Sequence, residues 1–89
     1  MIFVKDRLKF DTDKMKFVSY KCRVIDPNSL LGGFVDCKLY KSKKGNWLGV
    51  YESDNTWYSV RMTEDQAIDM LLAYDVGAYE RVFGELEEG

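Results

Sequence analysis

The fold of this chain is decided by the stretch LYKSKKGNWLGVY, residues 39–51, because it sets how two strands pair. Three lysines, two tyrosines and a tryptophan surround Gly45, with apolar residues alternating on both sides. Such alternation around a glycine predicts an antiparallel hairpin. A two-residue turn, Lys44-Gly45, gives the glycine the positive φ that such turns need and places Leu39 opposite Val50. The lysines keep the tip soluble and discourage edge-to-edge pairing.

A second turn sets the position of the next strand. Strands are predicted at residues 34–42, 46–52 and 56–62, which together form a three-stranded meander. A three-residue loop, Ser53-Asp54-Asn55, uses the tolerance of asparagine for left-handed backbone and places Leu48 opposite Val60. A shorter Asp54-Asn55 turn would put Arg61 beside Leu48 instead, so the longer loop is the prediction.

This register predicts a meander with two chemically different faces. The aliphatic face, expected beneath the C-terminal helices, carries Cys37, Leu39, Leu48, Val50, Tyr58, Val60 and Met62. The aromatic and basic face carries Lys38, Tyr40, Trp47, Gly49, Tyr51, Trp57, Ser59 and Arg61. Either the N-terminal segment covers this second face or the face is open to a ligand.

The two ends of the chain supply the rest of the fold. Residues 1–25 are predicted to form an N-terminal β-hairpin, and residues 2–10 within it form one strand or a small hairpin of their own. The apolar residues that share a parity are Ile2, Val4, Leu8 and Phe10, and then Val18, Tyr20, Cys22 and Val24. From Thr63 the period becomes helical, with a capping box formed with Gln66. A second short helix is expected to begin after Asp75 and to end at Gly84.

These elements predict an α+β fold in a single domain, residues 1–89. An antiparallel β-meander of about four to five strands is followed by one or two C-terminal helices packed on the sheet. The predicted parts are the N-terminal β-hairpin (1–25), the three-stranded meander (34–62), the helical segment (63–84) and an acidic tail (85–89).

The composition is that of a globular protein, with 46% hydrophobic residues, 15% aromatic residues and one proline. No apolar run reaches the roughly 18 residues of a membrane span. Charges at residues 5–7 interrupt the place where a secretory signal would be apolar, so a cytoplasmic protein is expected. Cys22 and Cys37 lie in alternating apolar patterns, which favours two small buried side chains over a disulfide or redox pair.

Charge is unevenly distributed along the chain. Residues 1–62 hold twelve lysines and arginines against seven acids, a balance of +5. Residues 63–89 hold eight acids against Arg81, a balance of −7. This division predicts either a polarised surface that steers charged partners or two regions that neutralise each other within the fold.

Three stretches point to a known family: LKFDTDKMKF (8–17), LYKSKKGNW (39–47) and MTEDQAIDMLLAYDVGAYERVFGELEE (62–88). They resemble an uncharacterised family of small proteins of bacterial prophages and other mobile elements, which shows a Leu-Tyr-basic-Gly hairpin and a Tyr-Glu-x-x-Phe-Gly-Glu tail. That family also carries a longer glycine-rich insert where this chain has only residues 53–55. The resemblance implies an interaction protein of a mobile element, and it points to no catalytic activity because none of the shared motifs is catalytic.

Catalysis is not predicted from the residues either. The chain has no histidine, so neither a histidine base nor a histidine metal ligand is available. Gly32 and Gly33 lack the strand-to-helix context of a phosphate-binding motif. We expect a protein that is not an enzyme, with no catalytic residues, no metal and no cofactor.

Two binding functions remain, and the oligomeric state is left open. The resemblance implies a phage or mobile-element inhibitor of a host defence nuclease complex, whose acidic helical surface meets a basic nucleic-acid cleft. The partner-binding residues would be Asp69, Asp75, Glu80, Glu85, Glu87 and Glu88. A solvated acidic tail is the other interpretation of these residues. The alternative function is binding of single-stranded nucleic acid on the aromatic and basic sheet face, through Lys38, Tyr40, Trp47, Tyr51, Trp57 and Arg61.

Overall fold

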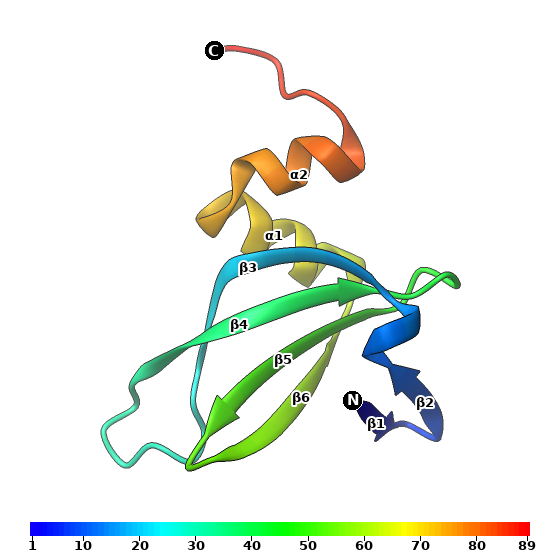
Figure 1. Cartoon of the computed structure of the whole chain (residues 1–89). Coiled ribbons are helices and arrows are strands. Elements are labelled where there is room, and N and C mark those ends of the chain that lie inside the picture. The colour runs from blue at the N-terminus through cyan, green and yellow to red at the C-terminus, as the bar shows by residue number, and fades with distance from the viewer.

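Four antiparallel strands form a meander in the spatial order β3-β4-β5-β6, and two helices follow it (Figure 1). The computed structural model describes all residues from Met1 to Gly89. The strands are β1 (Ile2–Lys5), β2 (Leu8–Asp11), β3 (Lys16–Ile25), β4 (Phe34–Lys41), β5 (Trp47–Ser53) and β6 (Thr56–Met62). The helices are the 3₁₀ turn η1 (Thr12–Lys14), α1 (Glu64–Tyr74) and α2 (Val76–Phe83). The predicted α+β class, with helices packed on an antiparallel meander, is confirmed.

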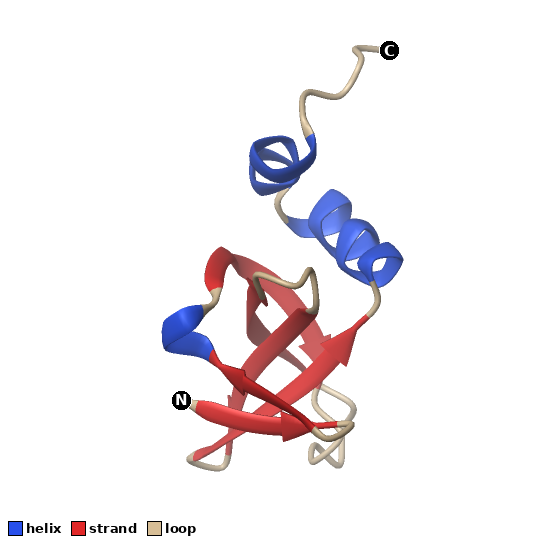
Figure 2. Ribbon diagram, turned by 90° about the vertical axis from the view of Figure 1, so that its right-hand side faces the viewer, coloured by secondary structure: helices blue, strands red, loops and turns tan.

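The strands β1 and β2 form a separate hairpin beside the strongly twisted sheet, away from the helices (Figure 2). Its turn, Asp6-Arg7, has φ values of 52° and 63°, as a type I′ turn requires. This two-residue turn places Phe3 opposite Phe10, so the two rings share one side of the hairpin. The prediction that Ile2 and Val4 share the buried side of Phe10 is wrong, because both are exposed. β3 belongs to the larger sheet, so the N-terminal hairpin ends with β2.

The register of β3 against β4 is irregular in two places, between Phe17 and Ser19 and between Ser19 and Cys22. Irregularities of this kind change the direction in which later side chains point. Val18 and Cys22 join the core beneath the helices, whereas Tyr20 is exposed. The prediction that Tyr20 shares their side is therefore wrong.

The β4–β5 hairpin closes on three residues, 43–45, and not on the two that were predicted. The Ser42 N–H donates to the Asn46 carbonyl at 2.8 Å, and the last turn residue, a glycine, has a φ of 85°. A left-handed glycine at the third position is typical of a three-residue hairpin loop. The extra residue places Gly49 opposite Leu39.

The β5–β6 hairpin closes on two residues, Asp54-Asn55, and not on the three that were predicted. Both have positive φ, 50° and 61°, which is type I′ geometry. Leu48 therefore lies opposite Arg61, and Val50 lies opposite Ser59. This is the pairing that the sequence disfavours, because it mixes polar with aliphatic residues.

The first turn is one residue longer than predicted and the second is one residue shorter. The side chains of β5 therefore all lie on the opposite face from the prediction, whereas those of β6 keep their predicted face. The helix side of the sheet carries Cys37, Leu39, Trp47, Gly49, Tyr51, Tyr58, Val60 and Met62. The hairpin side carries Lys38, Tyr40, Leu48, Val50, Glu52, Trp57, Ser59 and Arg61. The predicted division into an aliphatic face and an aromatic face is therefore wrong.

The physical reason is that β5 is a central strand, buried without a break from residue 47 to residue 51. On the helix side, the Trp47 ring stacks on the Phe83 ring of α2, with centroids 6.0 Å apart. On the hairpin side, Leu48 packs in a second cluster with Phe10. A strand that is apolar on both faces has no preferred parity, so the turns alone orient it.

Both helices begin where the sequence predicts. Thr63 Oγ1 accepts from the Gln66 N–H at 3.1 Å, and Gln66 Oε1 accepts from the Thr63 N–H at 2.9 Å. This reciprocal pair is the predicted capping box, and α2 likewise begins after Asp75 and ends at Gly84. The helical residues buried in the helix-side core are Ala67, Leu71 and Ala78. Neither helix has the length and apolar composition needed to cross a bilayer.

The two cysteines lie opposite each other on β3 and β4. Cys22 and Cys37 are both buried, free thiols, as the alternating pattern predicts. Burial raises the pKa of each thiol, that of Cys37 to about 12. They serve as small apolar side chains of the helix-side core.

Candidate functional site

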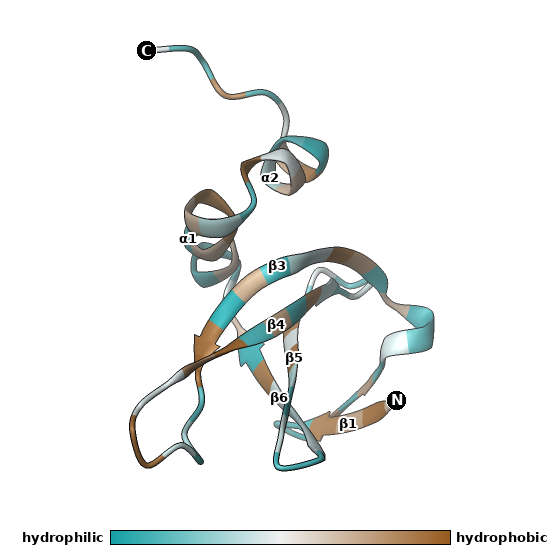
Figure 3. Cartoon of the chain, turned by 60° about the vertical axis from the view of Figure 1, so that its left-hand side comes forward, coloured by the Kyte–Doolittle hydropathy of each residue, from teal (hydrophilic) through white to brown (hydrophobic).

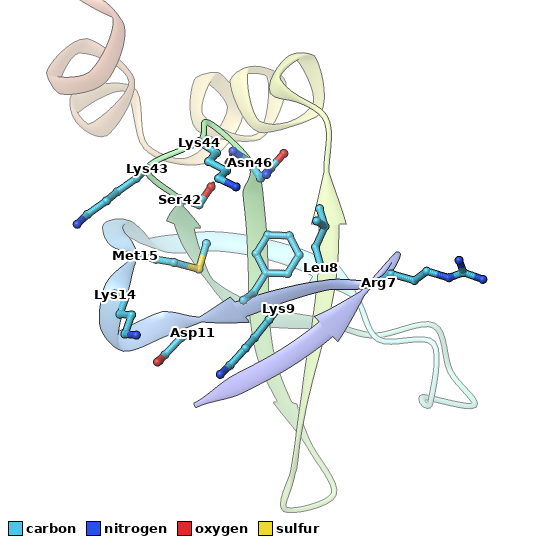
Figure 4. Close-up of a pocket in the computed structure, with 11 residues that line it drawn as sticks. Arg7, Leu8, Lys9, Asp11, Lys14, Met15, Ser42, Lys43, Lys44 and Asn46 are labelled. Atoms are coloured by element: carbon cyan, nitrogen blue, oxygen red, sulfur yellow. Dashed lines mark hydrogen bonds between the residues drawn. The ribbon is translucent and has the colours of Figure 1, made fainter.

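The basic cleft is a hollow between the N-terminal hairpin and the β4–β5 turn (Figure 4). Its volume is about 460 Å³, and its charged lining consists of Arg7, Lys9, Lys14, Lys43, Lys44 and one acid, Asp11. Lys43 and Lys44 come from the turn, whereas Lys9 and Lys14 come from β2 and η1 on the other wall. Two parts of the chain that are far apart in sequence therefore line one hollow, and the charged ends of Arg7, Lys9 and Lys43 point outward from it (Figure 4).

Local hydrogen bonds hold both walls of the basic cleft. Asp11 caps η1 by accepting from the Asp13 N–H at 3.1 Å, and the Thr12 N–H donates to the Met1 carbonyl at 2.9 Å. On the turn side, the Asn46 N–H donates to Ser42 Oγ at 3.0 Å. The backbone of η1 and of the β4–β5 turn, which carries Lys14, Lys43 and Lys44, is thus held by hydrogen bonds.

None of the five cations has an ion-pair partner. The salt bridges of the protein lie elsewhere, at Met1 N–Asp13, Arg23–Asp36 and Arg61–Asp6. The only acid in the lining, Asp11, accepts the capping hydrogen bond of η1. The lining therefore carries five positive charges against one negative charge, and this excess attracts anions.

A second hollow, of about 380 Å³, continues the positive surface at the edge of the sheet. It shares Lys14 and Lys43 with the basic cleft and adds Lys16 and Lys41. Lys16 and Lys41 lie directly opposite each other on β3 and β4, and like charges in this arrangement destabilise a sheet. Lys41 Nζ lies 5.3 Å from the centre of the Trp47 ring, which offsets part of this cost. A bound anion would remove more of the repulsion.

The sheet groove is a hollow of about 420 Å³ on the hairpin side, lined by Tyr20, Asp36, Lys38, Val50, Glu52 and Trp57. Lys38 Nζ lies 5.6 Å from the centre of the Trp57 ring. The Tyr20 ring is 67% exposed and lies 6.4 Å from the Phe17 ring, which in turn lies 5.5 Å from that of Tyr40. A row of partly exposed rings therefore leads from the sheet groove toward the start of β3.

The structure divides the predicted nucleic-acid residues between the two sides of the sheet. Trp47 and Tyr51 are buried on the helix side and cannot stack on a ligand. The predicted residues on the hairpin side are Lys38, Tyr40, Trp57 and Arg61. Of these, Arg61 is engaged, because its Nη1 donates to Asp6 Oδ2 at 3.0 Å. The predicted single platform of six residues is therefore not formed.

The predicted acidic residues differ in what their carboxylates bind. Asp75 accepts from the Ala78 N–H at 3.1 Å and from Ser19 Oγ at 2.6 Å. The hydrogen bond from Ser19 is the main reason why the pKa of Asp75 is lowered. Glu80 Oε2 accepts from the Leu86 N–H at 3.0 Å. The remaining predicted acids are exposed, on α1 and in the C-terminal tail: Asp69, Glu85, Glu87 and Glu88.

Several residues of the basic cleft were not predicted as site residues, above all Arg7, Lys9 and Lys14. The balance of +5 over residues 1–62 is a signal for them, but it does not show where cations gather. Lys43 and Lys44 are predicted only as a soluble turn tip. Packing of the N-terminal hairpin against the β4–β5 turn places the cations of both segments around the same hollow.

Neither a metal-binding group nor similarity to known proteins indicates the function of this chain. No group of three or more His, Cys, Asp or Glu side chains is placed to hold a metal ion. No protein-family model matches the chain, and no curated protein or solved structure matches it. The resemblance to mobile-element proteins stays a prediction, so function has to be inferred from the surface.

Proposed function

We propose that the protein binds single-stranded nucleic acid without catalysing a reaction on it, with the phosphate backbone in the basic cleft. The supporting observation is a set of five cations around one concave space, none of them in an ion pair. Phosphates that contact such a surface release condensed counterions, which supplies affinity without base recognition. The net charge of −2 does not oppose binding strongly, because exposed charges are screened beyond about 10 Å at 0.1 M salt.

An unpaired strand suits this surface better than a duplex. The basic cleft also has apolar lining residues, Leu8, Phe10 and Met15. On the same side of the sheet lie the exposed rings of Phe17 and Tyr20. Unpaired bases stack on such rings, with about 1–3 kcal/mol lost per base when a ring is removed, whereas duplex bases are already stacked. A strand that runs from the basic cleft toward the sheet groove would meet lysines first and rings next.

The proposal is tested by fluorescence anisotropy with labelled poly-dT and poly-U strands and with a duplex of equal length. We expect both single strands to bind more tightly than the duplex, with an affinity that falls steeply as salt is added. The variant Lys43→Glu should weaken binding about tenfold and reduce the salt slope by at least about one, since a phosphate contact is lost.

The matched control is Lys21→Glu, an exposed lysine of β3 that does not line the basic cleft. It changes the net charge by the same amount and should leave affinity within about twofold of the native value, because screening limits its reach. An equal loss in both variants would mean that only net charge matters. Absence of binding to every polymer at low salt would exclude the function.

A second candidate is a protein-binding role for the acidic C-terminal surface. It is favoured by the exposure of Asp69, Glu85, Glu87 and Glu88, none of which is in a salt bridge. Such a surface suits the basic cleft of a nuclease, the partner class that the mobile-element resemblance implies. Inhibition of a purified host nuclease by the native chain, lost on reversal of Glu80 and Glu85 to lysine, would support this role. Unchanged inhibition in that variant would exclude it.

A further inference from the structure

The loop between β3 and β4 carries two leucines at its tip that are fully exposed. Leu30 and Leu31 are 102% and 96% exposed, more than any other large hydrophobic side chain of the protein. The tip of this loop has the colour of the most hydrophobic residues in Figure 3. Leucine gains free energy when it leaves water, so two adjacent leucines on a protruding tip mark a contact surface.

Hydrogen bonds at the base of the loop hold this shape. The Asn28 N–H donates to Asp26 Oδ1 at 2.9 Å, and the Asp26 N–H donates to the Gly33 carbonyl at 2.9 Å. From β5, Ser53 Oγ donates to Asp26 Oδ2 at 2.5 Å. The base of the loop that carries the leucines is therefore bonded to the sheet. Because the loop is already partly ordered, it loses less conformational entropy when it forms a contact.

Beside the loop lies the apolar groove, a hollow of about 430 Å³ where the end of β3 approaches β5, β6 and α1. Its apolar lining includes Val24, Tyr51, Val60, Met62 and Met70. Arg61 is the only charged residue in the lining. Ile25 and Pro27 belong both to this groove and to the approach to the loop, so the leucines and the groove are neighbours on one surface.

The geometry points to a second copy of this chain as the occupant of the apolar groove. Two chains would pair about a two-fold axis, each placing Leu30 and Leu31 in the groove of the other. A two-fold interface brings the same patch of both chains together. If the protruding loop and the groove are neighbours on one chain, a single two-fold rotation places each loop in the groove of the other chain. The chain itself thus supplies both halves of an apolar contact.

The charge of the two surfaces is also compatible with a second copy. Residues 27–33 of the loop carry no charged side chain, so their approach to the groove opposes no like charges. Val60, which lines the groove, is itself partly exposed and adds to the apolar surface there. A stable interface buries about 800 Å² on each partner, so the two reciprocal loop contacts would form the centre of an interface that surrounding contacts complete.

The test is the molar mass in solution, measured by sedimentation equilibrium over a range of protein concentrations. We expect the native chain to form dimers and the variant Leu30→Ser/Leu31→Ser to be a monomer. Because the leucines contact no core, the monomeric variant should still unfold in one cooperative transition, at a lower midpoint than the native dimer, since association stabilises the folded state. The matched control is Ile2→Ser/Val4→Ser, which removes two exposed apolar side chains of the hairpin and should leave the dimer unchanged.

A mixing experiment separates loop-in-groove contact from general stickiness. Val60→Glu places a charge in the apolar groove and should also give monomers. A mixture of Val60→Glu with the double leucine variant restores one of the two contacts, so we expect partial return of the dimer. A native chain that stays monomeric, a leucine variant that stays dimeric, or binding to neutral phospholipid vesicles alone would overturn the proposal. The Lys43→Glu variant should remain dimeric, so this outcome is independent of nucleic-acid binding.

Discussion

Gly49 is the residue at which β5 passes closest to the side chains of the neighbouring strands. A Cβ atom at this position would lie 2.7 Å from Met62 Cε, 2.8 Å from Cys37 Sγ and 3.1 Å from Val60 Cγ1. The methionine tip can move aside, but the cysteine is fully buried on the paired strand. The absence of a side chain at Gly49 is therefore what lets the helix-side core close over the centre of the sheet.

We expect Gly49→Ala to destabilise the protein by about 1–3 kcal/mol, the usual cost of adding a methyl group to a packed core. Urea denaturation followed by tryptophan fluorescence measures this change. Gly77→Ala is the matched control, because the added Cβ meets no atom closer than 3.7 Å and alanine favours a helix. If both variants lose stability equally, the close approach at Gly49 does not limit packing.

At the scale of elements, Asp75 joins the C-terminal helices to the edge of the sheet. Its carboxylate caps α2 through the Ala78 N–H and accepts a hydrogen bond from Ser19 Oγ on β3. These bonds favour the ionised form, and the one from Ser19 is the largest cause of the lowered pKa. A group with a lowered pKa in the folded state stabilises the protein above its unfolded pKa, which is about 3.9 for aspartate.

We expect Asp75→Ala to lower the free energy of unfolding by about 1–2 kcal/mol at neutral pH, as for the loss of other helix caps. The difference from the native protein should shrink as the pH falls from about 4 through the lower pKa of folded Asp75, because the unfolded carboxylate is protonated first and the folded one after it. Urea denaturation at a series of pH values measures both quantities.

Asp69→Ala is the control for this pH dependence, since Asp69 is an exposed acid of α1 with no partner in a salt bridge. Its effect should be small, because this exposed carboxylate has no ion-pair partner to lose. A loss for Asp75→Ala that is the same at pH 7 and well below pH 4 would show that packing, and not the ionised carboxylate, is responsible.

At the scale of the whole molecule, the two cysteines report how cooperatively the sheet and helices open. Cys22 and Cys37 lie beneath the helices, in the middle of the larger core. Burial raises the pKa of both, so neither thiolate is available at neutral pH in the folded state. Modification therefore requires an opening that removes the helices from the sheet.

We expect iodoacetamide to modify both thiols of the native protein slowly at neutral pH, and no faster than global unfolding exposes them. Mass spectrometry after timed quenching should show both cysteines reacting together, with a rate that rises with urea as the unfolded population does. A cysteine introduced at the exposed Thr56 is the control and should react at once. Early modification of Cys22 alone would show instead that β3 opens separately at its irregular edge.

Much of the fold follows from the sequence, because its signals act over short distances. The capping box of Thr63 and Gln66, the cap at Asp75 and the stop at Gly84 each depend on residues within one or two turns of a helix. The strands of the meander follow from alternation in the same local way. The sequence therefore determined the meander, the helix ends and the α+β class, but it left open whether residues 2–10 form one strand or two.

Only the tertiary structure decided which way β5 faces and where the basic cleft lies. Both the odd-numbered and the even-numbered residues of 47–51 are buried, so hydrophobicity alone does not orient the strand. Its orientation is set by the two turns, of which the first is one residue longer and the second one residue shorter than predicted. The cleft joins the cations of the N-terminal hairpin to Lys43 and Lys44 through contacts between segments far apart in the chain. Such contacts depend on how a hairpin packs on a finished sheet, and no local pattern contains that information.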